Sequence, residues 1–201
     1  MTDVSEVLDD KDYEFGFHDD VKPVYSTGLG LTEDTVREIS KAKDEPQWML
    51  DYRLKAYHTY LKMAEPGFGP DLTGLDLKHM KFFQRATDKQ YRDWDDVPQE
   101  IKTTFDRLGV PQAERKYLAG SSAQYESEVV YHKMEEQFDK LGIIFTDTDT
   151  ALKKYPELFK KWFGKLVKPT NNKYAALNSA CWSGGTFIYV PKGVTVTTPI
   201  Q

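Results

Sequence analysis

Two aspartates stand directly after an apolar stretch in residues 143–150, whose sequence is IIFTDTDT. An Asp-x-Asp pair at the end of a buried strand, here Asp147 and Asp149, can carry phosphoryl-transfer chemistry. In that chemistry the first carboxylate is the nucleophile, the second is the general acid and base, and both lie beside a magnesium ion. The pattern therefore makes Asp147 and Asp149 candidates for a magnesium-dependent phosphatase site.

The same two aspartates also have a simpler structural interpretation. The pattern resembles the first motif of the haloacid-dehalogenase phosphatases, but those proteins have Thr or Val where this chain has Ala151. Their fold also needs a lysine and further carboxylates on later strands, and 52 residues, 150 to 201, remain here. An aspartate just before Thr150 can instead cap a helix, because its carboxylate accepts hydrogen bonds from the free N–H groups of the first turn. We favour the cap and keep the phosphatase as an alternative.

Cys181 is the one cysteine of the chain, so an internal disulfide and a cluster built from this chain's thiolates alone are excluded. It lies next to Trp182 and ahead of a glycine turn, and a buried, inert thiol is the usual state of such a residue, although it is also the one residue that we name as a candidate metal ligand. None of the histidines has a second histidine or a cysteine at ligand spacing. These are His18, His58, His79 and His132. We therefore predict no catalytic residue and no metal site, and we leave cofactor-binding residues unknown.

The overall charge disfavours some classes of partner. The 201 residues include 27 lysines and arginines and 32 aspartates and glutamates, which gives a formal net charge of −5. An acidic chain is poorly suited to duplex nucleic acid or to an anionic membrane, because both attract basic surfaces. Residues 1–20 contain eight acids and one base, the reverse of a secretory signal, and no apolar run approaches about 20 residues. We expect a cytoplasmic protein with neither nucleic acid nor a membrane as its partner.

The residue pattern predicts mostly helix up to about residue 170. Thr32 is a candidate N-cap for a helix that ends near Lys43, and a longer helix is expected from Pro46. The apolar residues of this longer helix recur at spacings of four, three and four, which predicts one buried stripe. The stripe consists of Leu50, Leu54, Tyr57 and Leu61, and Arg53 lies off it. Residues 66–96 are expected to form an ordered loop. Further helices are predicted near residues 96–109, 111–118, 134–142 and 146–154, and from 156 onward.

Strand signals are concentrated near the end of the chain. Residues 129–131 and 143–145 are candidate short strands, and residues 186–190 and 194–197 have the β-branched and aromatic residues typical of strands. Two strands do not make a stable sheet by themselves. We therefore expect the last two strands either to pair with the preceding part of the chain or to continue in a longer protein.

Four stretches have a distinctive sequence. They are KQYRDWDDVP at 89–98, AG followed by AQYESEVVYH within 119–132, GIIFTDTDTAL at 142–152, and YAALNSA leading to SGGTFIYVPKG within 174–193. Together they resemble the SufB branch of the SufB/SufD family, the scaffold of the Suf iron–sulfur cluster assembly system. The resemblance covers the chain from about Tyr13 to Gln201.

The resemblance implies an α+β fold, in which an α-rich N-terminal domain leads into the first strands of a right-handed parallel β-helix. It divides the chain into an acidic segment (1–30), the α-rich domain (31–170) and the entry into the β-helix (171–201). It also implies a scaffold rather than an enzyme, with three partners: the ATPase SufC, the paralogue SufD, and a cysteine desulfurase with its sulfur-transfer partner. An iron–sulfur cluster is implied for the full-length protein, and none is expected on this segment alone. The cysteine that accepts sulfur in this family lies beyond Gln201, so no catalytic residue is transferred.

This chain departs from the family pattern in two places. Some members have a run of spaced cysteines near the N-terminus, and here no cysteine precedes Cys181. Cys181 itself occupies a position where a small apolar residue such as Val is expected, which favours packing over metal ligation. A free-standing protein-interaction module is the first alternative to the scaffold, and the phosphatase built on Asp147 and Asp149 is the second.

Overall fold

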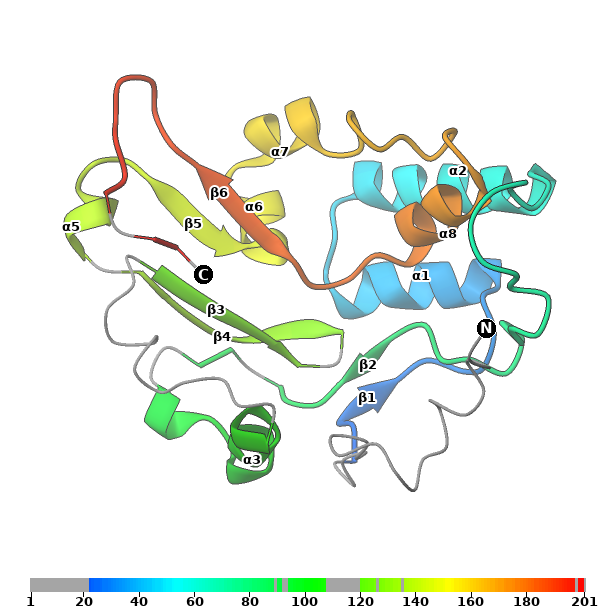
Figure 1. The fold of residues 1–201 in the computed structure, drawn as a ribbon, viewed down its shortest axis with the longest axis horizontal. Coiled ribbons are helices and arrows are strands. Elements are labelled where there is room, and N and C mark those ends of the chain that lie inside the picture. Colours follow the sequence, from blue (N-terminus) through cyan, green and yellow to red (C-terminus); the bar gives the residue numbers. More distant parts are fainter. Residues whose placement is uncertain are drawn as a thin grey trace, which may run out of the picture.

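The computed structural model describes residues 22–88, 90–91, 94–107, 120–125, 127–134, 136–197 and 199–200. Three helices, α1 (Glu33–Ala42), α2 (Gln47–Lys62) and α8 (Lys173–Cys181), lie together at one end of the molecule (Figure 1). Thr32 caps α1 as predicted, since its hydroxyl accepts a hydrogen bond from Thr35 N at 3.1 Å. Asn172 caps α8 in the same way through Ala175 N, at 2.9 Å.

The buried face of α2 differs from the predicted stripe. Met49, Arg53 and Ala56 are fully buried, whereas the side chain of Leu61 is 58% exposed. The other three residues of the predicted stripe are only half-buried. The prediction was wrong because it left Arg53 off the buried face. Arg53 instead points into the protein, where ionic and backbone partners compensate its charge.

The described strands form three antiparallel pairs. Strand β1 (Tyr25–Ser26) pairs with β2 (Gln84–Arg85), β3 (Gly120–Tyr125) with β4 (Glu128–Met134), and β5 (Ile144–Asp147) with β6 (Thr186–Tyr189). The pairs β3–β4 and β5–β6 lie beside each other at the end opposite α1, α2 and α8 (Figure 1). Strand β6 thus pairs with an earlier part of the chain, which was one of the two arrangements expected from the sequence. The parallel β-helix stays a prediction.

Three predicted strands are confirmed, in β4, β5 and β6, and one is wrong. Residues 194–197 form no strand, and Val194 and Val196 instead pack against Phe138 and Ile143. Strand β3 was not predicted, because its sequence GSSAQY is rich in small polar residues that are typical of turns.

Short helices connect these units. Helix α3 (Gln99–Arg107) follows a 3₁₀ turn at Trp94–Asp96, and α5 (Glu136–Asp139), α6 (Thr148–Lys154) and α7 (Pro156–Trp162) follow in order. The predicted helix at 134–142 is reduced to the single turn α5, because Met134 still belongs to β4 and Gly142 has a φ of +73°. The helix predicted at 111–118 lies outside the described residues.

An aromatic core joins the helical end to the strands. Phe159 of α7 stacks on Phe163 with ring centroids 4.7 Å apart and lies 6.2 Å from Trp182, which follows α8. Met49 of α2 and Leu152 of α6 complete the buried cluster. Because these residues come from α2, α6, α7 and the end of α8, the core fixes the position of α6, on which the site described next depends. Helix α8 and strand β6 both follow the predicted boundary at residue 170, yet they pack against elements that precede it.

Candidate functional site: a cavity lined by ion pairs

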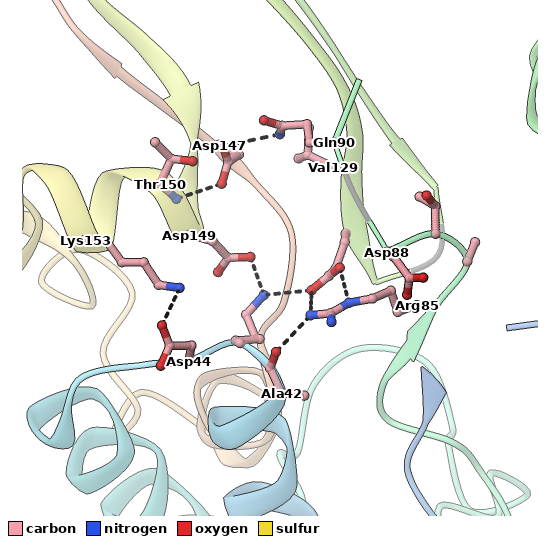
Figure 2. Close-up of a pocket in the computed structure, with 14 residues that line it drawn as sticks. Ala42, Asp44, Arg85, Asp88, Gln90, Val129, Asp147, Asp149, Thr150 and Lys153 are labelled. Carbon is pink, nitrogen blue, oxygen red and sulfur yellow. Dashed lines mark hydrogen bonds and ion pairs between the residues drawn. The ribbon is translucent and has the colours of Figure 1, made fainter. Parts of the chain in front are cut away.

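A cavity of about 360 Å³ lies where the end of α1, strand β2, the start of β4 and the β5–α6 turn meet (Figure 2). Three cationic and five acidic side chains line it. The cations are Lys43, Arg85 and Lys153, and the acids are Asp44, Asp88, Glu128, Asp147 and Asp149. Such a concentration of charge needs close pairing, because an uncompensated charge away from water is costly.

Lys43 is the most deeply buried of these charges. Its side chain is 0% exposed, and its Nζ donates a hydrogen bond to Asp149 Oδ2 at 2.7 Å. The same ammonium lies 4.0 Å from Glu128 Oε1, 5.7 Å from the ring centre of Phe83 and 5.6 Å from that of Trp182. Two carboxylates and two aromatic faces thus take the place of water around this cation.

Arg85 makes a two-pronged ion pair with Glu128. Its Nε and Nη2 donate to the two carboxylate oxygens at 2.6 and 2.8 Å, and Nη2 also donates to Ala42 O at 2.9 Å. Hydrogen bonding to Glu128 raises the pKa of Arg85. The contact with Ala42 O satisfies a carbonyl in the last turn of α1, which has no partner inside the helix. Arg85 therefore ties strand β2 to both β4 and α1.

Asp147 is the N-cap of α6, as predicted. Its Oδ1 accepts a hydrogen bond from Thr150 N at 2.8 Å, and its Oδ2 accepts one from Gln90 Nε2 at 3.3 Å (Figure 2). Burial alone would raise the pKa of this carboxyl, but the hydrogen bonds from Thr150 and Gln90 outweigh it and lower the pKa. Asp147 is therefore ionised and held in place by the helix that it begins.

Asp149, two residues later, has the opposite electrostatic environment. Burial raises its pKa, and the Lys43 ammonium only partly opposes that shift. Its Oδ1 is buried and has no hydrogen-bond partner among the described residues. The pKa values of two neighbouring carboxyls are thus driven apart, an arrangement that acid–base sites also use. Here, however, both carboxyls serve structural contacts: Asp147 holds a helix end and Asp149 neutralises a buried lysine.

The remaining candidate residues lie outside this cavity. The Cys181 thiol, at the end of α8, donates to Leu177 O at 3.1 Å, and burial raises its pKa to about 11. His58 lies on α2 with its Nε2 3.3 Å from Glu33 Oε2, and His79 lies beside Asp76. His18 lies outside the described residues, and only the backbone of His132 is described, in β4. In the part of the chain that the structure describes, no three His, Cys, Asp or Glu side chains are grouped to hold a metal ion.

Sequence reasoning identified the two aspartates and the helix turn at Thr150 that Asp147 caps, but none of the ion-pair partners in the cavity. Lys43 is 106 positions from Asp149, and Arg85 is 43 positions from Glu128. No periodicity or spacing rule connects residues so far apart. The one available signal was the lysine that follows a predicted helix end, and that signal also fits a solvated C-terminal cation.

Comparison with known proteins identifies the family of the chain. Residues 99–201, just over half of it, match the family model of the SufBD protein N-terminal region. Over 190 residues the chain is 55% identical to iron–sulfur cluster assembly SufBD family proteins of Staphylococcus haemolyticus, Staphylococcus aureus (strain USA300) and Staphylococcus epidermidis. The chain belongs to the SufBD family, as the resemblance predicted, while its assignment to SufB rather than SufD stays a prediction.

The alignment covers most of this chain but less than half of each relative. It includes 94% of this chain but 41% of each relative, so the chain spans about two fifths of their length. Glu128, Asp147 and Asp149 lie inside the stretch that the family model matches, whereas Lys43 and Arg85 precede it. The ion pairs of the cavity therefore fasten the family region to the residues before it. No helix among the described residues is long and apolar enough to cross a membrane.

Proposed function

We propose that this chain is the N-terminal part of a SufB-type scaffold. The scaffold would work with SufC and SufD to build iron–sulfur clusters from persulfide sulfur and iron, and would pass them to apoproteins in the cytoplasm. The observation that carries the proposal is the 55% identity over 190 residues to SufBD family assembly proteins. The sequence stretches that resemble SufB favour it over SufD. The scaffold itself is not an enzyme under this proposal, since ATP hydrolysis belongs to SufC.

The part of this segment in that function is structural and connective. Iron–sulfur clusters are held by several thiolates, and this chain has one cysteine, whose thiol is largely buried and hydrogen-bonded to Leu177 O. The residues that hold the cluster then belong to the remainder of the protein. This segment would cover the end of the β-helix and meet the cysteine desulfurase with its sulfur-transfer partner. The aromatic content of 13% and the acidic residues 1–20 motivate this role.

A chimeric protein tests the proposal in a complete chain. The 190 matched residues of the S. aureus relative are replaced by those of this chain, and the chimera is expressed in S. aureus cells depleted of that relative. We expect the chimera to restore growth and the activity of aconitase, an enzyme that needs an iron–sulfur cluster. The relative lacking these 190 residues is the control. The proposal fails if the chimera accumulates normally and restores neither growth nor aconitase.

Anaerobic reconstitution with ferrous iron and sulfide tests the expectation that no cluster forms on this segment alone. We expect no stable charge-transfer absorption from the chain by itself. A chromophore that disappears in Cys181→Ser would instead make Cys181 a ligand, shared between two chains because one thiolate is too few.

A further inference from the structure

The end of α7 and the residues after it expose large apolar side chains. Trp162 is 62% exposed, Leu166 92% and Val167 63%. Single exposed apolar residues are ordinary on protein surfaces, but here three of them lie within six positions of the chain, and groups of exposed apolar side chains mark interaction sites. We call residues 160–168 the Trp162 segment.

The Trp162 segment is packed onto the aromatic core through Phe163 and Gly164. Phe159 and Phe163 point inward and stack on each other, and Phe163 also lies 5.4 Å from Tyr52 and 4.8 Å from Trp182 between ring centroids. The chain then turns at Gly164, whose φ is +65° and whose missing Cβ would lie 2.5 Å from Tyr52 Oη. Because the inward positions are already filled by aromatic rings, the apolar side chains after the turn remain on the surface.

The surface around this patch is basic, although the protein is acidic. Lys160, Lys161, Lys165 and Lys168 are all exposed, and none forms an ion pair with a carboxylate of the described residues. Residues 153–168 contain six lysines and one glutamate, a local charge of +5. Since the whole chain carries −5, the other residues carry −10. A local positive field of this kind attracts an acidic partner at contact distances, where salt screens it least.

A recess opens beside the patch. Phe163, Gly164 and Val167 line one side of a cavity of about 450 Å³, and Trp182 and Thr148 lie among its other lining residues. Trp182 is 8% exposed, yet its Nε1 has no hydrogen-bond partner among the described residues, and the same holds for the buried Thr148 Oγ1. Buried polar atoms are normally satisfied. The recess therefore has two polar atoms in its lining residues, Trp182 Nε1 and Thr148 Oγ1, that no group of the described residues satisfies.

We propose that the Trp162 segment and this recess form a docking site for an acidic segment of a protein partner that also carries apolar side chains. The carboxylates of that segment meet the four lysines, its apolar side chains cover Trp162, Leu166 and Val167, and an acceptor enters the recess. An anionic membrane fits less well, because a bilayer surface cannot fill a recess and would repel the rest of this acidic chain. The inference does not depend on the proposed function.

Binding of a defined peptide tests the docking site. The probe is a fluorescein-labelled 16-residue peptide in which Asp and Glu alternate with Leu and Phe, and its binding to the chain is measured by fluorescence anisotropy. A peptide with Lys in place of every acid is the control probe. We expect only the acidic peptide to bind, with an affinity that falls at least tenfold between 50 and 500 mM NaCl.

Matched variants locate the binding. We expect Lys161→Glu with Lys165→Glu, and separately Trp162→Ala, to weaken binding at least tenfold. Lys55→Glu with Lys62→Glu, which reverses the same charge at exposed positions of α2, is expected to change it less than twofold. The proposal is overturned if the two double lysine variants lose peptide affinity equally, or if the acidic and basic peptides bind equally well. It is also overturned if the chain binds phosphatidylglycerol vesicles but not the peptide. The same holds if the chimera with the S. aureus relative does not bind the peptide, since the remainder of the protein then covers the surface.

Discussion

The buried ion pair between Arg53 and Glu45 offers the sharpest test of how the helical end is held together. Both side chains are 0% exposed, and Arg53 Nε and Nη2 donate to the two carboxylate oxygens at 2.7 and 2.6 Å. Arg53 Nη1 donates to Ala180 O at 3.1 Å, and the guanidinium lies 4.6 Å from the ring centre of Trp182. The substitution Glu45→Gln keeps the volume of the side chain but leaves the arginine charge buried without its counter-charge.

The loss of the counter-charge sets the expected fall in the free energy of unfolding. Breaking one side of a buried ion pair typically costs about 3–5 kcal/mol of unfolding free energy. The amide introduced by Glu45→Gln can still accept one hydrogen bond from Arg53, so the lower end, about 3 kcal/mol, is expected. With a urea dependence of about 2 kcal/mol per molar, the midpoint of urea unfolding should fall by about 1.5 M.

Urea unfolding followed by circular dichroism measures this shift, and the chain supplies its own control. Arg37 and Glu33 form a similar two-contact pair on the surface of α1, with side chains 50% and 43% exposed. Exposed pairs contribute little, so Glu33→Gln should leave the midpoint almost unchanged. If the Glu45→Gln midpoint lies within 0.3 M of the Glu33→Gln midpoint, on the order of 0.6 kcal/mol by the same slope, the reasoning about the buried pair is refuted.

Three further predictions concern single residues of the fold. Asp147→Ala should lower the unfolding free energy by about 1 kcal/mol through loss of the cap, whereas Asp147→Asn keeps the cap. Because the pKa of Asp147 is lowered from 3.8, its ionic contribution is present above that pH and is lost on further acidification, so the wild type and Asp147→Asn should converge in acid urea titrations. A magnesium-dependent phosphate release that Asp147→Asn abolishes would instead support the phosphatase. With a pKa of about 11 against an ordinary 8.5, Cys181 should react with iodoacetamide about 300-fold more slowly than free cysteine at pH 7.5, and equal rates before unfolding in urea would contradict its burial. Gly164→Ala should lower the thermal midpoint more than Gly69→Ala, since both glycines have positive φ but only Gly164 meets a side chain, that of Tyr52; equal losses would show that the contact is unimportant.

Local patterns predicted the local parts of the fold. The caps at Thr32 and Asp147 could be predicted because a cap joins a side-chain oxygen to the backbone N–H three positions later, so both partners lie in the same short stretch of sequence. Strands β5 and β6 were found because their sequences, IFTD and TFIY, are rich in β-branched and aromatic residues.

Three of the failures share one physical origin, which is that they depend on residues distant in sequence; strand β3 was missed instead because its own sequence is typical of turns. Arg53 could not be placed in the core from its own helix, since Ala180, one of its partners, lies 127 positions away. Val194 and Val196 alternate like a strand, but they have no strand partner among the described residues and pack on Phe138 and Ile143 instead. The ion pairs of the candidate site were missed for the same reason.

The distant contacts of α1 and α2 also set the order in which the protein can fold during synthesis. The contact of Lys43 with Asp149 and that of Arg53 with Ala180 can form only after the later residue has been synthesised. The aromatic core that includes Met49 is likewise complete only when Trp182 has been added. At about 5–20 residues per second, the ribosome needs roughly 6–24 s to add the 120 residues between Lys62 and Trp182. During most of that interval Lys43 lacks its partner Asp149, whereas Arg53 already has Glu45, which lies eight positions earlier in the chain. The α1–α2 region can therefore complete its buried contacts only after α8 and Trp182 have been synthesised.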